Sequence, residues 1–261
     1  MGAPEPEEIF ERTQAEGERR LTRPFLELLT TSLAAGFDIL AGLVILGLLT
    51  AQTEHEWGAH AAHVFGSLGF GSAFAFLVVG RGELFTENFL VPLAALDHRQ
   101  KRLWYKLGEL WTVSPIGNIV GGTIVAVIVT VHSVLPYGTG AAIVSSSQHV
   151  HENGWLALFC SAVFAGALMT AMTWFVEGQE NMLVRVVIAW TVGVVIALGY
   201  FDHVIVETIE LIFGIRYGAP IPWSFVIENF FLAAAGNMVG GIGLITLNRF
   251  TQAKAESSTS A

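Results

Sequence analysis

Three long stretches without a charged side chain constrain the fold of this chain more than any other feature of its sequence. Residues 57–80, 110–148 and 153–176 contain no Asp, Glu, Lys or Arg. A helix needs about 20 apolar residues to cross the hydrocarbon core of a bilayer, and each stretch is longer than that. Charged residues make up 13% of the chain, against about a quarter in a typical soluble domain. The sequence therefore predicts an all-α membrane protein and excludes a nucleic-acid-binding protein, a disordered chain and a secreted disulfide-stabilised domain.

Six spans are predicted from these stretches and the apolar residues around them. They cover 30–52, 58–80, 110–134, 154–176, 183–201 and 222–247. Two shorter apolar segments, 86–96 and 203–215, directly follow the second and the fifth span, and each is too short to cross a bilayer alone. The sequence therefore predicts two helices that are broken within the membrane.

The positions of Arg and Lys predict the orientation of the spans. These residues precede the first span, occupy the 97–109 loop and follow the last span, whereas the connections 53–57 and 135–153 contain none. Since cytoplasmic loops carry an excess of Arg and Lys, both termini are expected in the cytoplasm and the chain in the plasma (inner) membrane. Arg216, in an expected outer loop, is the exception.

Five segments are expected along the chain. Residues 1–28 have early acidic residues and no apolar core, unlike a signal peptide, and should form a cytoplasmic segment. Their mixture of apolar and charged residues indicates an amphipathic helix over part of the segment, the alternative being a solvated tail. A first three-span unit over 29–134, an extracytoplasmic loop over 135–153 and a second unit over 154–248 follow. The Ser/Thr-rich end, 249–261, is predicted to be a disordered cytoplasmic tail.

One short motif occurs twice. Residues 117–122, Gly-Asn-Ile-Val-Gly-Gly, recur 119 residues later as 236–241, Gly-Asn-Met-Val-Gly-Gly. A three-span unit repeated across an odd number of crossings must be inverted in the membrane, and such folds place the solute path between the two units. The glycines alone are also explained by close helix packing. We expect Asn118 and Asn237 to hydrogen-bond the interrupted backbone near them.

The two expected breaks carry polar side chains at membrane depth. Residues 80–88 are Gly-Arg-Gly-Glu-Leu-Phe-Thr-Glu-Asn, and residues 199–207 are Gly-Tyr-Phe-Asp-His-Val-Ile-Val-Glu. Thr86 and His203 lie 117 residues apart, close to the offset of the repeated motif, which indicates equivalent places in the two units. Polar groups at this depth are costly and usually mark a solute path or a buried pair.

These residues resemble a known family. Gly82-Glu83-Leu84-Phe85-Thr86-x-Asn88 resembles the G-x-[ED]-L-F-T-x-N signature of the formate/nitrite transporter family, and Phe201-Asp202-His203 is similar to its F-E-H segment, which carries the family's central pore histidine. The resemblance spans roughly residues 25–250 and is closest to the YfdC-like branch. It implies an aquaporin-like six-helix fold with inverted three-helix repeats, a homopentamer with one pore per protomer, and passage of small monovalent anions such as formate, nitrite or hydrosulfide. It implies no enzymatic activity and no cofactor.

The chemistry of the breaks agrees with this resemblance. A bare anion in hydrocarbon is very costly unless hydrogen-bond donors replace its water. Thr86 supplies a hydroxyl, and His203 can donate a hydrogen bond or pass a proton, so that the solute leaves as a neutral weak acid. His203 would then lie between two apolar collars; the alternatives are a satisfied interior histidine and ordinary core packing. Expected pore contacts are His203, Thr86, Leu84 and Phe85, and expected collar residues are Phe70, Phe74, Met169 and Ile196.

The chain departs from the family pattern where the solute would enter. The family's Lys near the outer mouth is replaced by His149 and His151, and the Asn expected four residues after the pore histidine is Glu207. Gly166 stands where the family has an Asn in the fourth span. Acidic residues are numerous within or near the spans, and Arg81, Arg185 and Arg216 are the only Arg or Lys partners expected there. Structural or proton-relay roles are expected for Glu83, Asn88, Asn118, Asn237, Asp202, Glu207 and Asp38.

Two other functions remain open from the residues. A neutral-solute or water channel would share the inverted repeat, although the paired Asn-Pro-Ala boxes of aquaporins are absent. A non-conducting scaffold descended from a channel would explain the missing Lys and the extra acids. A metal site is not expected, because Glu-x-x-His pairs do not occur inside the predicted spans.

Overall fold

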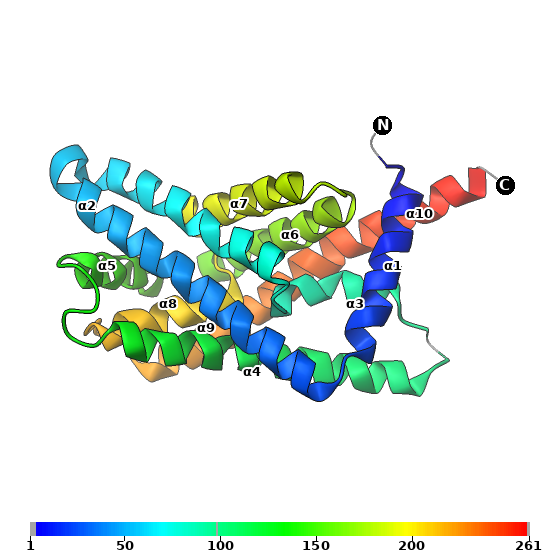
Figure 1. The fold of residues 1–261 in the computed structure, drawn as a ribbon, viewed down its shortest axis with the longest axis horizontal. Coiled ribbons are helices and arrows are strands. Elements are labelled where there is room, and N and C mark those ends of the chain that lie inside the picture. Colours follow the sequence, from blue (N-terminus) through cyan, green and yellow to red (C-terminus); the bar gives the residue numbers. More distant parts are fainter. Residues whose placement is uncertain (1–3, 98, 260–261) are drawn as a thin grey trace.

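The computed structural model describes residues 4–97 and 99–259, and every regular element over these residues is a helix (Figure 1). The α-helices are α1 (Pro6–Thr22), α2 (Phe25–Gly80), α3 (Val91–Ala94), α4 (Lys101–Val129), α5 (Thr139–His151), α6 (Trp155–Glu177), α7 (Met182–Leu198), α8 (Val204–Arg216), α9 (Trp223–Met238) and α10 (Leu247–Thr259). A 3₁₀ helix, η1 (Phe85–Phe89), precedes α3, and a π-helix, η2 (Val239–Thr246), joins α9 to α10.

The first two predicted spans form one element, α2, that turns back on itself. Gly58 lies inside it with φ 77° and ψ 167°, a non-helical conformation that glycine adopts without a side-chain clash. Figure 1 shows the blue arm of α2 turning back into the cyan arm at the end of the molecule where α5 lies. The arms on either side of Gly58 contain the predicted spans 30–52 and 58–80.

The remaining spans occur close to where the sequence places them. Among the described residues, four helical segments are long and apolar enough to cross a membrane: α2, α4, α6 and the continuous stretch Trp223–Ala255. The shorter apolar helix α7 lies between α6 and the second break. With α2 counted as two arms, these segments supply six crossings.

The two breaks have the same backbone geometry at their start. Arg81 (φ 54°) follows α2 and Tyr200 (φ 49°) follows α7, and both are left-handed, which ends each helix abruptly. After the first break the chain forms only η1 and the single turn α3, whereas after the second it forms the 13-residue helix α8. The predicted broken segments 86–96 and 203–215 are therefore present but unequal in length.

Glycines of the repeated motif sit where two helix backbones touch. A Cβ on Gly121 would collide with the carbonyl oxygen of Leu33, and a Cβ on Gly240 would collide with that of Val163. The motif thus packs α4 on the first arm of α2, and η2 on α6. Close approach of this kind requires a residue without a side chain.

Two predicted irregular segments are helical instead. The loop predicted over 135–153 contains α5, whose residues Thr139, Ala142, Ile143, Ser147 and Val150 are buried on one face. The tail predicted to be disordered over 249–261 continues as α10 to Thr259, and residues 260–261 lie outside the described part of the chain. Packing explains this difference, because Phe250 meets Phe10 of α1 edge to face at 5.1 Å between ring centroids.

The N-terminal segment is a docked helix. α1 buries Thr13, Gly17 and Leu21, and a Cβ on Gly17 would collide with the carbonyl oxygen of Val91 in α3. Figure 1 shows α1 and α10 together at the end of the molecule that carries both termini. This end is called the terminal end below, and the opposite end, where α5 lies, is called the α5 end.

Candidate functional site

The two breaks meet at a buried hydrogen bond between Thr86 and His203. Thr86 Oγ1 and His203 Nε2 are 2.7 Å apart, and both side chains have no exposed surface. His203 is also the N-cap of α8, where its Nδ1 accepts a hydrogen bond from the backbone N–H of Val206 at 3.2 Å. Since Nδ1 accepts, a neutral imidazole carries its proton on Nε2 and donates it to Thr86. The Thr86 hydroxyl is then free to donate its own proton elsewhere.

Asn118 holds the first break together. Its Oδ1 accepts from the backbone N–H of Phe85 at 3.0 Å, and its Nδ2 donates to the carbonyl oxygens of Glu83 at 2.8 Å and Ser32 at 2.9 Å. Broken helices leave backbone groups without helical partners, and these must be satisfied inside the protein at membrane depth. Asn118 therefore supplies partners on both sides of Leu84.

Asn237 makes the same three contacts at the second break. Its Oδ1 accepts from the backbone N–H of Val204 at 3.0 Å, and its Nδ2 donates to the carbonyl oxygens of Asp202 at 3.0 Å and Ala162 at 2.7 Å. The hydrogen bonds to interrupted backbone that the sequence predicts for both asparagines are thus present.

These contacts also correct the register of the repeat. The two asparagines, their amide donors Phe85 and Val204, and their left-handed neighbours Arg81 and Tyr200 are each 119 residues apart. The equivalent of His203 is accordingly Leu84, and the interpretation of Thr86 and His203 as equivalents at an offset of 117 is wrong. Thr86 and His203 therefore do not occupy equivalent positions in the two units, although their side chains are in contact.

Two of the predicted collar residues, Phe70 and Phe74, place apolar rings near His203. The Phe74 ring meets the His203 ring edge to face at 6.0 Å between centroids, and Phe70 packs on Phe74 at 5.8 Å. Phe70 and Ile196 line a cavity of about 30 Å³ towards the α5 end. Leu84, Phe85 and Met169 are buried in the same apolar core but do not line that cavity.

The α5 end contains two adjoining cavities. The 30 Å³ cavity shares Leu46, His63, Ser146 and Tyr200 with a wider one of about 110 Å³ that reaches Glu54. The Tyr200 ring stacks on His63 at 4.3 Å and meets His149 at 4.1 Å between centroids. His149 therefore lies near this path, whereas His151 packs on Phe225 at 4.4 Å and lines neither cavity. The sequence interpretation missed His63 and Tyr200 as path residues.

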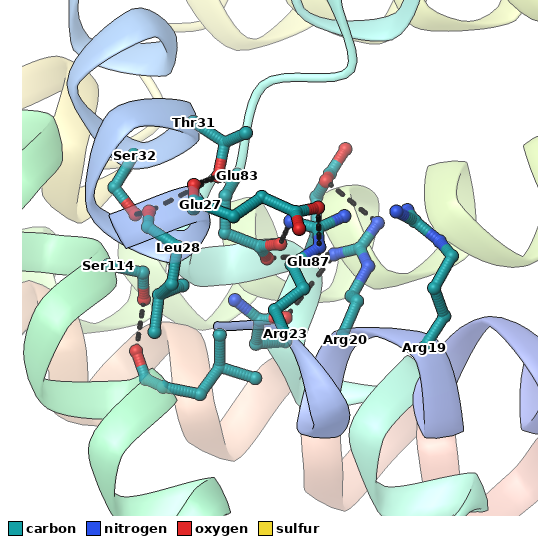
Figure 2. Close-up of polar contacts among 12 residues, drawn as sticks. Arg19, Arg20, Arg23, Glu27, Leu28, Thr31, Ser32, Glu83, Glu87 and Ser114 are labelled. Carbon is teal, nitrogen blue, oxygen red and sulfur yellow. Dashed lines mark hydrogen bonds and ion pairs between the residues drawn. The ribbon is translucent and has the colours of Figure 1, made fainter. Parts of the chain in front are cut away.

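At the terminal end, α1 supplies the cations for the acids of the first break (Figure 2). Arg20 contacts Glu83 at 3.1 Å and Glu87 at 3.3 Å, and it also donates to Asn88 Oδ1 at 3.3 Å. Arg23 forms a second ion pair with Glu83. All of these acids and arginines are largely buried, so each charge depends on its partner.

This pairing corrects the expectation that Arg81, Arg185 and Arg216 are the only cationic partners of the interior acids. Arg185 donates from Nε to the carbonyl oxygen of Gln179 at 2.6 Å, and Arg216 donates from Nε to Thr130 at 3.3 Å. The cations for the first break come from a segment that the sequence places outside the spans. A cluster of arginines ahead of the first span was the signal that could have indicated this.

A cavity of about 460 Å³ opens beside these ion pairs. Six arginines and three glutamates belong to its wall: Arg12, Arg19, Arg20, Arg23, Arg81, Arg185, Glu16, Glu87 and Glu177. Burial alone would raise the pKa of Glu16, but hydrogen bonds and positive charge from Arg19 and Arg20 outweigh this effect and lower the pKa to about 2. Glu16 is thus firmly ionised. Three arginines of the wall, Arg12, Arg20 and Arg23, pair with acids that lie outside it, so the charges of this region nearly balance.

The other predicted acids lie in different surroundings. Asp202 Oδ1 accepts from Asn229 Nδ2 at 3.4 Å, and the backbone N–H of Asp202 donates to Ser161 Oγ at 2.9 Å. Glu207 is buried beside the 30 Å³ cavity. Asp38 is half-buried on the first arm of α2, close to Gly80 and away from the cavities at the α5 end.

Two inverted three-helix units, with polar groups buried where their breaks meet midway through an apolar bundle, define a membrane transport protein. The chain belongs to the formate/nitrite transporter family, whose sequence profile matches residues 7–251. Members of this family are channels and transporters and not enzymes, as the resemblance implied.

Individual relatives agree with this assignment. The chain is 29% identical over 256 residues to the inner membrane protein YfdC of Escherichia coli, covering 96% of this chain and 79% of that protein. It is 22% identical over 242 residues to the formate channel FocA of Haemophilus influenzae, covering 84% of each.

Solved structures share the fold. A pentameric formate channel with formate bound superposes with a TM-score of 0.73 at 19% identity, covering 87% of this chain and 96% of that one. An FNT family ion channel superposes with a TM-score of 0.76 at 16% identity, covering 93% and 98%. The predicted aquaporin-like fold is therefore confirmed.

Proposed function

We propose that the protein carries small monovalent anions or their weak acids, of the formate, nitrite and hydrosulfide class, through a path that passes Thr86 and His203. The observation that carries this proposal is the buried hydrogen bond of 2.7 Å between these two side chains at the meeting of the breaks. A solute anion stripped of water needs donors at this depth. The Thr86 hydroxyl, polarised by the Nε2 proton of His203, is such a donor.

The surroundings of the pair support the same function. The cavity of about 460 Å³ at the terminal end reaches Gly82 and Glu87 of the first break, and the cavities at the α5 end lead towards His203 from the other side. Between them, Phe70 and Phe74 keep the environment of the imidazole apolar. In such surroundings an anion gains by taking a proton and passing as a neutral acid.

The assembly and location follow from the relatives and from charge. We propose a homopentamer with one path per protomer, since a pentameric formate channel has the same fold. We place the chain in the inner membrane with both termini cytoplasmic, since its relative YfdC is an inner membrane protein and Arg and Lys flank the terminal end. The wide arginine-lined cavity would then face the cytoplasm.

Flux measurements test the function. Purified protein in proteoliposomes should take up formate, nitrite or hydrosulfide faster than protein-free vesicles between about pH 5 and about pH 8, a window that spans the ordinary titration range of histidine. His203→Ala should alter the flux strongly, while His132→Ala, at an exposed position, should not. Water or glycerol permeation without anion flux would indicate a neutral-solute channel. Intact wild-type protein that passes none of these solutes would favour a non-conducting scaffold.

A further inference from the structure

Two carboxyl groups with unsatisfied oxygens line the small cavity on the α5 side of His203. Glu207 and Glu210 have exposed fractions of 4% and 6%, and one Oε atom of each has no hydrogen-bond partner among the described residues. Both belong to the wall of the 30 Å³ cavity. Since they are three residues apart on α8, their side chains share one face of that helix. A buried oxygen without a hydrogen bond costs free energy, so these two oxygens favour a proton or a hydrogen-bonding solute in the cavity.

Among the residues that the structure describes, no Lys or Arg lines this cavity. The titratable groups that face the pair are His63 from α2, and Tyr200 and Asp202 from the segment that precedes α8. Ser146 of α5 completes the polar wall, and neither α4 nor α9 contributes a charged side chain to it. Two carboxylates that share an apolar site without a cation repel each other strongly, and one of them retains a proton.

We propose that Glu207 and Glu210 form a proton-donor site, at which a small weak-acid anion arriving from the α5 end takes up a proton before it reaches His203. This inference rests on the proposed function and extends it to a second site. The cavity has room for about two water molecules, which suits a solute of very few atoms. At His63 and Tyr200 it adjoins the 110 Å³ cavity, so protons from water can reach the glutamate pair from the α5 end.

The proton transfer is balanced. The O–H bond of one carboxyl group breaks, and a new O–H bond forms on the solute anion, which becomes a neutral acid. Because the pair holds a single proton, this transfer leaves both groups ionised, and their mutual repulsion favours rapid reprotonation. A proton from water at the α5 end then restores the first O–H bond. One proton therefore moves with each anion.

His203 is poorly placed to take this role from the α5 side. Its Nε2 proton is given to Thr86, and its Nδ1 accepts from the backbone of Val206. Both ring nitrogens are thus engaged in holding the breaks together. The glutamate pair has unpartnered oxygens and belongs to the wall of the cavity on that side.

The protonation state can be tested without transport. Infrared spectra of the reconstituted full-length protein near pH 7 should contain a C=O band from a protonated carboxyl group. This band should be lost in the Glu207→Gln, Glu210→Gln double variant. Glu56→Gln, at an exposed position near the α5 end, should leave the band unchanged. A band that persists in the double variant, or is absent from the wild type, overturns the proton-donor site.

Flux then tests the coupling. The ratio of internal to external formate that the wild type reaches should rise roughly tenfold for each unit by which the external pH lies below the internal pH, because one proton accompanies each anion. In the double variant this rise should shrink to less than about twofold, and Glu207→Asp with Glu210 intact should restore most of it. A wild type that transports, with a double variant that keeps the full pH dependence, overturns the inference and leaves the proposed function standing. A wild type that transports nothing overturns the proposed function and the coupling together, while the infrared band still decides the protonation of the pair.

Discussion

Asn118 and Asn237 occupy the same place in the two inverted units, and each bridges the two sides of a helix break with the same three hydrogen bonds. Each amide therefore satisfies one backbone N–H and one carbonyl oxygen of the break, and its third hydrogen bond reaches a carbonyl oxygen of a neighbouring helix, α2 or α6. Because lipid supplies no hydrogen bonds, the breaks depend on these two side chains.

Replacement of either asparagine by Ala should destabilise the fold. Asn118→Ala or Asn237→Ala leaves one buried N–H and one buried carbonyl oxygen of the break unsatisfied and should lower the free energy of unfolding by roughly 2–3 kcal/mol. Thermal unfolding in detergent measures the change. Asn153→Ala is the control, since Asn153 is exposed and its side chain donates a hydrogen bond to the carbonyl oxygen of His149 within the same stretch of chain. Equal midpoints for Asn118→Ala and Asn153→Ala would contradict this role.

The hydroxyl of Thr86 gives a second prediction. Thr86→Val keeps the shape of the side chain and removes the donor, so anion flux should fall roughly tenfold or more, the factor that corresponds to one hydrogen bond of about 1.4 kcal/mol. Thr86→Ser retains the hydroxyl and should keep most of the flux. Proteoliposome uptake with matched protein content makes the comparison. If the Val and Ser variants transport equally, the hydroxyl has no part in conduction.

Much of the fold could be predicted because its signals are local. Uncharged length predicts the spans, and recurrence of Gly-Asn predicts the doubled unit. The helix α5 was missed because its sequence contains three consecutive serines, Ser145 to Ser147, although its buried residues recur at helical spacing. The offset of 117 was wrong because it compared side chains of interest and not the backbone positions that the asparagines hold.

The ion pairs of the first break could not be predicted from local pattern. Arg20 lies 63 residues before Glu83 and 67 before Glu87, and only the docking of α1 brings them together. Acids inside a bilayer require partners, but that requirement does not identify which arginine supplies the charge. The site at the terminal end therefore depends on tertiary packing.

Arg23 should be important for stability. Arg23→Ala leaves Glu83 buried with only Arg20 as a cationic partner, and loss of one partner of a buried pair costs about 3–5 kcal/mol. The Arg23→Ala, Glu83→Gln double variant should recover part of that loss, because no uncompensated charge remains. Arg12→Ala removes an exposed pair with Glu180 and should cost no more than about 1 kcal/mol. Thermal unfolding of the wild type and the three variants decides, and a double variant that is no more stable than Arg23→Ala would contradict the coupling.

Acid should destabilise α1. The pKa of Glu16 is lowered to about 2 in the folded protein, because its pairs with Arg19 and Arg20 outweigh its burial, against an ordinary value of 4.5. The unfolded state binds the proton more readily, so the stabilisation from Glu16 is fully present above about pH 4.5 and is lost as the pH falls towards about 2. Hydrogen exchange of α1 should therefore increase, relative to α6, between about pH 5 and about pH 3, after correction for intrinsic exchange rates. Glu16→Gln should exchange at pH 7 as the wild type does in acid and should lose most of the pH dependence. An α1 that stays equally protected across this range in the wild type would show that the network of Glu16, Arg19 and Arg20 does not stabilise the helix.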